Sequence, residues 1–225
     1  MKEIKLNGVK NEEEPIINDG EGSFVVDNIF SIPILTIQVK DWNKKRKILM
    51  KHYLRQTESN DLYLRGDEEV LTSYVDFMDI SKKTDEWIEN NYKFVEGMQE
   101  LFEEEINLAY DKIIKPYSSL HLSKRKLKIG DFWFQNQNNG TAHGIHTHGS
   151  NGLSAVCYIK YDKQYHTSTH FISPNFNSFD NTNMTWHPEE STEGTMVFFP
   201  SNILHYTRPN NSDVSRIIAA INFIF

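Results

Sequence analysis

The feature that most constrains the fold is a series of short apolar segments that begins at Leu127 and continues to the end of the chain. The segments are rich in β-branched and aromatic residues, and clusters of Asn, Gly, Ser and Pro separate them. They read LKIGDFWFQNQ, LSAVCYIKY, STHFIS, GTMVFFP and SRIIAAINFIF. Many short strands with turn residues between them are typical of a sandwich or jelly roll, not of alternating βαβ units. The second half of the chain is therefore predicted to be a β core.

The first half of the chain is expected to supply a strand region and supporting helices. Residues 24–39 are rich in β-branched and aromatic types, which predicts one or two strands. Asp41 has the side chain of a helix N-cap and predicts a helix over roughly 42–57. Apolar residues at helical spacing predict a second helical region over about 81–115, which Pro116 ends. We therefore expect a β-dominated α+β fold with helices packed on the outside of the β core.

We expect the whole sequence, residues 1–225, to form a single domain. Residues 1–120 would supply the strand and the supporting helices, and residues 121–225 the jelly-roll core, because no repeat or Pro/Gly-rich linker divides the sequence. A chain of 225 residues buries roughly 70% of the surface that it exposes when unfolded. Its longest apolar stretches are far below the roughly 18 residues that span a bilayer. The first residues have no apolar signal segment, so a cytoplasmic location is expected.

Charge and cysteine content narrow the list of partners. The 24 Lys and Arg residues against 31 Asp and Glu residues give a net charge of −7, the wrong sign for general binding to a phosphate backbone. Two short basic clusters, at 44–47 and 124–128, are typical of a solvated helix face and of a polar turn. The single cysteine, Cys157, excludes an internal disulfide and any multi-cysteine metal site. A small-molecule or peptide substrate is therefore expected, rather than nucleic acid or a membrane.

Histidines gather in the predicted β core, where seven of the nine lie after residue 142. The densest group is H-G-I-H-T-H, directly before an apolar strand. Residues i and i+2 of an extended segment point the same way, so His146 and His148 are placed to bind one ion. Neutral imidazole is a good ligand for Fe(II), Zn or Ni. His143 lies an odd number of positions from His146 and would point away from it in an extended chain, so it is only an alternative ligand.

Two imidazoles bind a metal weakly, and His205 is the best candidate for a third ligand. It follows a predicted strand that ends at Pro200 and turns through Ser201 and Asn202. Arg216 opens the last apolar strand, where burying a guanidinium is costly unless an anion meets it. Guanidinium and carboxylate match as a bidentate pair. A metal together with a dedicated arginine indicates a bound carboxylate that also reaches the metal.

The order of these residues resembles the Fe(II)- and 2-oxoglutarate-dependent oxygenase superfamily, with H-x-(D/E/H), a distant His and an Arg about ten residues further on. More closely, H-T-H-G-S-N-G-L-S-A-V-C-Y-I and F-F-P-S-N-I-L-H-Y-T-R-P-N-N-S-D-V-S-R-I-I-A-A-I-N-F resemble a bacterial and phage family of 2-oxoglutarate/Fe(II) oxygenases. The F-S-I-P-I segment and the T-S-Y that ends at Tyr74 also fit, so the resemblance covers most of the chain. It implies a double-stranded β-helix (a cupin-like jelly roll) with the N-terminal helices packed on one sheet.

The resemblance also implies roles for individual residues. The implied metal ligands are His146, His148 and His205. Arg216 matches the residue that pairs with the distal carboxylate of 2-oxoglutarate, and Tyr158 matches a tyrosine that supports this carboxylate in prolyl hydroxylases. The chain departs from the family at His148, where a carboxylate is usual. It also departs at Ile218, where many relatives have Ser.

Three residues of the strand before the histidines, Trp133, Gln135 and Gln137, alternate onto one face. Trp133 is expected in the core. The glutamines, if they point into the barrel, are candidates to bind the C1 carboxylate of 2-oxoglutarate or the substrate, and we predict Gln135 as a co-substrate ligand beside Arg216 and Tyr158. The alternatives are a structural ion pair for Arg216 and a purely apolar role for Tyr158.

The function implied by the resemblance is that of an Fe(II)- and 2-oxoglutarate-dependent dioxygenase. Such an enzyme couples the oxidative decarboxylation of 2-oxoglutarate, to succinate and CO2, to the hydroxylation of a substrate. One alternative is a three-histidine cupin-type dioxygenase that binds its substrate directly on iron without 2-oxoglutarate. The other alternative is a non-catalytic jelly-roll module that binds a metal. Oxygen consumption coupled to succinate release separates the first function from both alternatives.

Overall fold

The computed structural model describes residues 32–58, 63–64, 70–74, 83–117, 125–149, 152–176, 180 and 182–225. The chain divides into two units, Met1–Pro33 and Ile34–Phe225, and the fold described below is that of the second unit. The first part of the predicted strand region, residues 24–31, lies outside the described residues. The expectation of a single domain over residues 1–225 stays a prediction.

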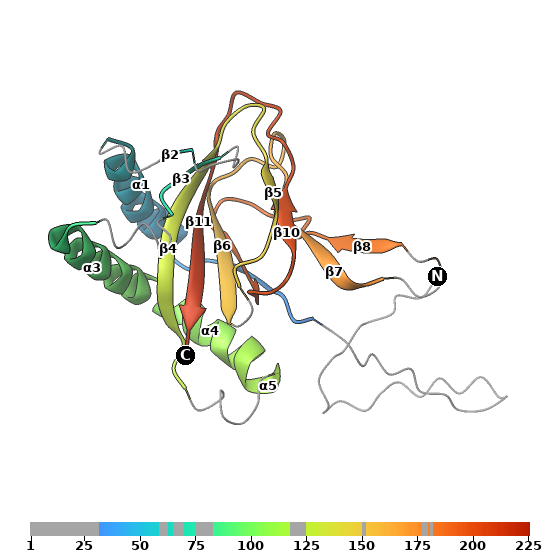
Figure 1. Cartoon of the computed structure of the whole chain (residues 1–225), viewed down its shortest axis with the longest axis horizontal. Coiled ribbons are helices and arrows are strands. Elements are labelled where there is room, and N and C mark those ends of the chain that lie inside the picture. The colour runs from blue at the N-terminus through green and yellow to red at the C-terminus, as the bar shows by residue number, and fades with distance from the viewer. Residues whose placement is uncertain are drawn as a thin grey trace. The chain divides into compact units, whose positions relative to one another are not determined.

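Two antiparallel sheets make up the β core (Figure 1). The larger, here called the major sheet, has seven strands in the order β1-β9-β6-β11-β4-β3-β2. Their bounds are β1 (Leu35–Gln38), β9 (Thr195–Pro200), β6 (Leu153–Lys160), β11 (Arg216–Ile224), β4 (Lys128–Gln137), β3 (Leu71–Thr72) and β2 (Tyr63–Leu64). The minor sheet has four strands in the order β5 (His143–His146), β10 (His205–Thr207), β7 (His170–Phe176) and β8 (Asn183–Trp186). The predicted jelly roll is confirmed.

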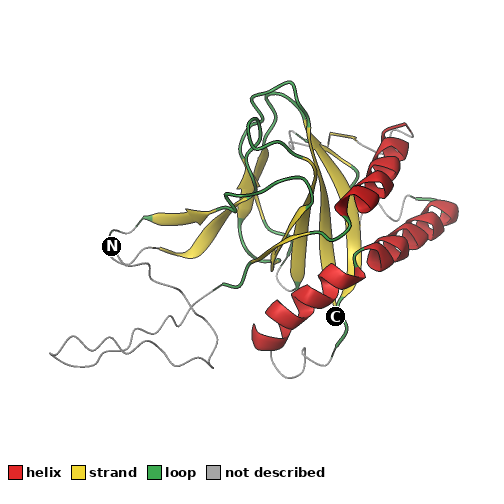
Figure 2. Cartoon of the chain, turned by 180° about the vertical axis from the view of Figure 1, so that it is seen from behind, coloured by secondary structure: helices red, strands yellow, loops and turns green. Residues whose placement is uncertain are grey.

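Helices cover one face of the major sheet (Figure 2). They are α1 (Trp42–Glu58), α3 (Asp85–Leu101), α4 (Glu103–Ala109), the π-helical turn η1 (Tyr110–Ile114) and α5 (Lys115–Tyr117). Both predicted helical regions are therefore present. The second is interrupted between α3 and α4, where Phe102 leaves helical geometry with φ −110° and ψ 17°. It runs one residue past Pro116, because the wider turn of η1 accommodates a residue that has no N–H to donate.

The strands of the major sheet place apolar residues on the helix side and a mixture of polar and apolar residues on the other. Phe132, Phe134, Ala219 and Ile221 belong to the cluster of buried residues under the helices. Because successive side chains of a strand point to opposite faces, the alternate residues of β4, β6 and β11 face the minor sheet. They include the polar residues Asp131, Gln135, Gln137, Ser154, Arg216 and Asn222, together with Trp133, Tyr158, Val156, Ile218 and Ala220. The space between the two sheets is therefore where polar chemistry is concentrated.

The basic cluster at 44–47 lies on α1, and half of it is paired rather than solvated. Lys45 Nζ lies 2.7 Å from Glu105 Oε2 of α4, with the two side chains only 12% and 3% exposed. Arg46 Nε lies 3.0 Å from Glu193 Oε2. The expectation of a solvated helix face was thus wrong for these two residues, because the carboxylates that neutralise them come from distant parts of the sequence.

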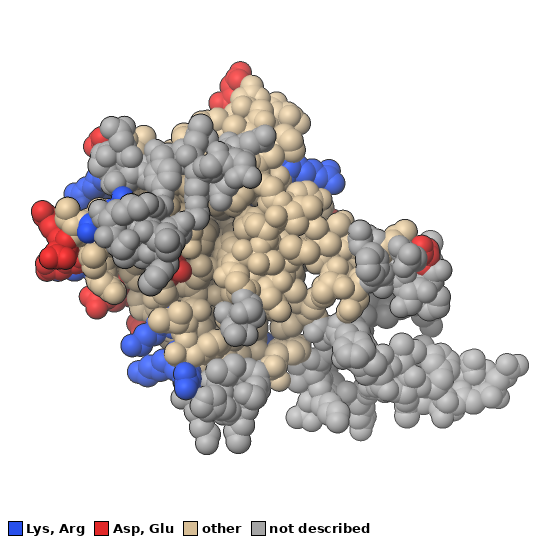
Figure 3. Space-filling view, in the orientation of Figure 1, with Lys and Arg blue, Asp and Glu red and all other residues tan. Residues whose placement is uncertain are grey.

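The surface of the described residues carries two further features. None of the described helices combines the length and the hydrophobicity that crossing a membrane requires. On the face in Figure 3, the described Lys and Arg side chains form separate small groups at the periphery, and the surface between them is largely uncharged.

Candidate metal centre

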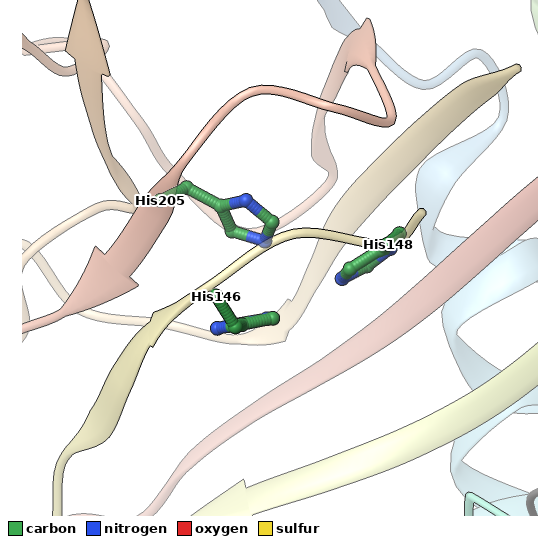
Figure 4. Close-up of side chains that lie close together, drawn as sticks. All are labelled: His146, His148 and His205. Carbon is green, nitrogen blue, oxygen red and sulfur yellow. The ribbon is translucent and has the colours of Figure 1, made fainter. Parts of the chain in front are cut away.

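Three histidines converge between the two sheets, and they are the three that the resemblance implies as metal ligands (Figure 4). In the minor sheet β5 pairs with β10, and this pairing places His146 directly opposite His205. His148 follows β5, and its main-chain N–H donates to the carbonyl of Ser201 at 2.8 Å. One potential ligand atom from each imidazole lies within 4.8 Å of the others. Segments 57 residues apart, counted from His148 to His205, thus meet at one point.

Each of the three imidazoles has one ring nitrogen held by an oxygen acceptor. His146 Nδ1 lies 2.8 Å from the carbonyl oxygen of Gly144, and His205 Nδ1 lies 2.9 Å from that of Ile203. His148 Nδ1 lies 2.8 Å from Asn222 Oδ1. Because these oxygens only accept hydrogen bonds, each Nδ1 must carry the proton and donate it. Every Nε2 therefore keeps a lone pair, which is the state that a metal ligand needs.

Burial keeps the three imidazoles neutral. Burial, followed by repulsion from the neighbouring imidazoles, lowers the pKa of His205 to about 2. The same causes, opposed by the hydrogen bond to Asn222, lower the pKa of His148 to about 4. Burial also lowers the pKa of His146. At neutral pH all three side chains are uncharged, so a cation does not have to displace protons to bind them.

His143 lies beside the cluster, contrary to the expectation that it would point away. Its ring centroid is 3.9 Å from that of His146. The pairing of β5 with β10 explains this contact, because His146 and His143 pair with His205 and Thr207, so that three positions on one strand match two on the other. Such a bulge turns a residue at odd spacing to the same side. His143 is buried, and burial with nearby positive charge lowers its pKa to about 3.

Aromatic rings surround the histidine cluster. Phe199 of β9 and Phe171 of β7 lie 4.8 and 5.9 Å from His205 between ring centroids. Trp133 of β4 lies 5.3 Å from His148. These rings shield the cluster from water on several sides, which strengthens the interaction of any bound ion with its ligands.

Arg216 is buried between the sheets without a described anionic partner. Its side chain is 3% exposed, and burial lowers the pKa of the guanidinium. Nη1 donates to Gln137 Oε1 and Nη2 to Thr169 Oγ1, each at a long 3.4 Å. Among the residues that the structure describes, Nε has no hydrogen-bond partner and no carboxylate pairs with the guanidinium. A buried cation held only by neutral groups at long distance is typical of a site that receives an anion.

Tyr158 supports this arginine through its ring and through Thr169. The Arg216 guanidinium carbon lies 5.1 Å from the centroid of the Tyr158 ring, which is fully buried. The Tyr158 hydroxyl accepts from the main-chain N–H of Thr169 at 2.8 Å and donates to Thr169 Oγ1 at 3.2 Å. Tyr158 is therefore a core aromatic residue that also takes part in the polar network around Arg216.

The two predicted glutamines differ in whether their side-chain amides are free to bind a ligand. Gln137 is fully engaged: its amide donates to the carbonyls of Thr141 and Arg208, each at 2.7 Å, and its oxygen accepts from Arg216. Gln135 lies on the same face of β4, between Trp133 and Gln137, and is 8% exposed. The described residues provide no hydrogen bond to its side chain, so it is the glutamine left free for a ligand.

The remaining core histidines have structural surroundings. His166 Nε2 donates to the Val214 carbonyl at 2.8 Å, and its Nδ1 accepts from the Asp162 N–H at 3.0 Å. His170 stacks on His187, with ring centroids 4.4 Å apart. His166 and His170 are both buried. A separate hollow of about 520 Å³ lies beside α1 and α3, lined in part by Trp87 and Phe94, on the helix side of the major sheet.

Comparison with a family model identifies the part of the chain that holds this site. Residues 131–222 match the family described as "Putative 2OG-Fe(II) oxygenase". The match includes both histidine segments, Tyr158 and Arg216, and it begins at Asp131 of β4. A comparison of the sequence with curated proteins finds no match.

Solved structures share the fold at low sequence identity. A prolyl-4-hydroxylase from Pseudomonas putida has 15% identity and a TM-score of 0.53, over 87% of this chain and 94% of that one. A prolyl hydroxylase from Trichoplax adhaerens, in complex with a hypoxia-inducible-factor peptide, has 9% identity and a TM-score of 0.54, over 85% and 83%. The epimerase SnoN, in complex with Fe3+, alpha-ketoglutarate and nogalamycin RO, has 8% identity and a TM-score of 0.58, over 86% and 79%. At such identities the likeness concerns the fold alone.

Proposed function

We propose that this chain is an Fe(II)- and 2-oxoglutarate-dependent dioxygenase that hydroxylates a small-molecule or peptide substrate, because residues 131–222 match the 2OG-Fe(II) oxygenase family. The cofactors predicted from the sequence are those in the name of the family. The observation that carries the proposal is the pairing of two features in one space: three neutral imidazoles with free Nε2 atoms, and a buried arginine without an anion.

His146, His148 and His205 would hold the iron through their Nε2 atoms. Their Nδ1–H groups are already committed to Gly144, Asn222 and Ile203, so the rings are oriented before the metal arrives. Imidazole nitrogen is a suitable donor for Fe(II). Three protein ligands also leave positions on the metal for a co-substrate and dioxygen, as in other non-haem iron oxygenases.

Arg216 would bind the distal carboxylate of 2-oxoglutarate. Its unpaired Nε and its two long hydrogen bonds leave the guanidinium able to take a bidentate carboxylate. Tyr158 and Thr169 would hold the guanidinium in place. Gln135, which has no described partner, would donate its amide N–H to the C1 carboxylate or to the substrate.

The reaction follows from what these residues arrange. Bound Fe(II) and 2-oxoglutarate supply the oxidative decarboxylation that consumes dioxygen, gives succinate and CO2, and transfers the second oxygen atom into a C–H bond of the substrate. The chain orients the co-substrate through Arg216, and the rings of Phe171 and Phe199 keep water away from His205. Three neutral imidazoles leave the full charge on the metal, which the 2-oxoglutarate dianion would neutralise.

One feature favours a second candidate function. The ligand position that is usually a carboxylate is a histidine here, His148. Three-histidine dioxygenases that bind the substrate directly on iron have the same kind of ligand set. Arg216 would then hold a carboxylate of the substrate. The two candidates differ in whether 2-oxoglutarate is consumed.

The test is to supply the full chain with Fe(II), 2-oxoglutarate and dioxygen, and to measure oxygen consumption and succinate together. We expect succinate to form in step with the oxygen consumed, and both to be lost in His205→Ala. Oxygen consumption without succinate would favour the three-histidine dioxygenase. Stoichiometric metal binding with neither oxygen consumption nor succinate formation would indicate a non-catalytic module.

A further inference from the structure

His148 is the ligand position at which this chain departs from the usual carboxylate, and its ring differs from the other two in how it is held. His146 and His205 donate Nδ1–H to main-chain carbonyls two residues away. His148 instead donates to the side chain of Asn222, 74 residues further along the chain on β11. The orientation of this one imidazole therefore depends on a side chain that can be replaced without changing the backbone.

The amide of Asn222 is itself fixed in orientation. Its Nδ2 donates to Asp131 Oδ2 of β4 at 3.2 Å, so its Oδ1 must point the other way, toward His148. The pairing of β11 with β4 places Asn222 directly opposite Asp131. Since only the donor end of the amide can face a carboxylate, Asp131 selects the rotamer of Asn222 in which Oδ1 meets the imidazole N–H.

A pair of serines completes the surroundings of Asn222. Ser154 of β6 lies opposite Asn222 in the sheet, and its Oγ donates to Asn222 Oδ1 at 3.0 Å. Ser154 Oγ also lies 2.8 Å from Ser201 Oγ, in the segment whose main-chain carbonyl accepts from the His148 N–H. The polar groups around His148 thus form one connected network anchored in three strands of the major sheet.

We propose that Asn222 is a positioning residue which, oriented by Asp131, holds His148 in the tautomer that presents a free Nε2 to the metal. This inference rests on the proposed function, because it assigns His148 to the metal centre. In place of the usual carboxylate ligand, this chain has an imidazole whose hydrogen-bonded chain runs through Asn222 to a carboxylate, that of Asp131. Partners of this kind orient a ligating histidine and raise its basicity.

The first test needs no metal. In the full chain labelled with 15N-histidine, NMR shifts of the ring nitrogens report which nitrogen of His148 carries the proton. We expect the Nδ1–H tautomer in the wild type and a shift toward the Nε2–H tautomer in Asn222→Leu, which keeps the size of the side chain but cannot accept a hydrogen bond. An Nε2–H tautomer in the wild type would overturn the proposal, whatever the protein does with iron.

The second test is anaerobic titration with Fe(II) alone. Loss of such a partner typically lowers metal affinity about 10–100-fold, and we expect this for Asn222→Leu. Asn222→Asp should also weaken binding, since it places two carboxylates side by side. The exchange Asn222→Asp/Asp131→Asn restores an acceptor for His148 and a donor for that acceptor, so its affinity should return to within about threefold of the wild type.

The matched control is Asn136→Leu, the same exchange at a buried asparagine of β4, on the face of the major sheet that is turned toward the helices. It should keep wild-type affinity within about threefold. If Asn136→Leu weakens metal binding as much as Asn222→Leu, or if the exchange variant folds but does not recover, Asn222 does not act through His148 and the proposal fails. Equal affinity of wild type and Asn222→Leu would also refute it while leaving the metal site intact. A wild type that binds no iron would refute the proposed function itself.

Discussion

At the scale of single residues, hydrogen bonds within the protein orient the side chains of the site. His205 is the most buried of the three converging imidazoles, at 3% exposure, and its Nδ1–H is held by Ile203. Arg216 is equally buried, with partners that are all neutral. Burying a polar side chain is costly unless its polar atoms find partners, and Arg216 Nε has none among the described residues. Changes at these two positions should therefore affect binding directly.

We predict that His205→Ala abolishes the binding of stoichiometric Fe(II). Two imidazoles alone should not hold the ion against buffer, since non-haem iron sites use three protein ligands. The measurement is an anaerobic Fe(II) titration of the full chain. His187→Ala, which removes a histidine outside the cluster, is the control and should retain one equivalent. One equivalent retained by His205→Ala would contradict the three-histidine site.

We predict that Arg216→Met raises the 2-oxoglutarate concentration needed for half-maximal succinate formation at least tenfold. Removing one partner of a buried charge pair costs about 2–5 kcal/mol. Arg208→Met is the matched control, because Arg208 directly follows β10 and is exposed, and it should leave the requirement unchanged. An unchanged requirement in Arg216→Met would mean that Arg216 has a structural role.

The sequence predicts some of these residues well and others poorly, for reasons of local geometry. His146 and His148 lie on one side because the i, i+2 rule holds across the end of β5. The same rule fails for His143, because a bulge in the pairing of β5 with β10 shifts the alternation. Asn222 is at even spacing from Arg216 and lies on the same face of β11, but the sequence alone left its orientation undecided. Its bond to His148 could not be predicted either, because that bond joins segments 74 residues apart.

At the scale of elements, the helical layer is tied to itself by a buried ion pair. Lys45 of α1 and Glu105 of α4 lie 2.7 Å apart, and Glu105 Oε1 also accepts from the main-chain N–H of Lys40 at 3.0 Å. This carboxylate therefore joins α4 both to α1 and to the segment that leads out of β1. Breaking a buried pair on one side leaves an uncompensated charge, which is more costly than losing an exposed pair.

We predict that Glu105→Gln lowers the free energy of unfolding by about 3 kcal/mol, measured by urea denaturation. The matched control is Glu89→Gln, which breaks the pair between Glu89 and Lys93 of α3, where both side chains are largely exposed. That change should cost no more than about 0.5 kcal/mol. Equal effects of the two substitutions on the free energy of unfolding would show that the buried pair of Glu105 and Lys45 does not stabilise the helical layer more than an exposed pair does.

The positions of most helices and strands were predictable from the sequence, but the pairing of the strands was not. The helix predicted over 42–57 agrees with α1 to within about a residue at each end. The second helical region breaks at Phe102, where neither proline nor glycine marks the position, whereas Gly97, the expected point of interruption, lies inside α3. The strands of the minor sheet are short, and the sequence predicted only part of them: β7 overlaps the predicted segment STHFIS, whereas β8 matches none of the predicted segments.

At the scale of the whole described unit, the two sheets contribute different residues to the space between them. The major sheet carries the apolar core on its helix side and supplies Arg216, Tyr158 and Asn222 on the other. The minor sheet supplies His146 and His205, and its β5–β10 pairing sets their separation. Because each sheet contributes only part of the site, the metal and the carboxylate are expected to bind as one unit. Binding of either should strengthen binding of the other.

An anaerobic calorimetric titration of the full chain with 2-oxoglutarate, with and without Fe(II), shows whether the three histidines and Arg216 form a single site. We predict one equivalent of 2-oxoglutarate bound in the presence of Fe(II), and affinity at least tenfold weaker without the metal or in His205→Ala, because the co-substrate would lose its contact with the metal while keeping Arg216. Failure to bind 2-oxoglutarate in the presence of Fe(II), or equal affinity with and without it, would contradict the claim that the three histidines and Arg216 form a single site.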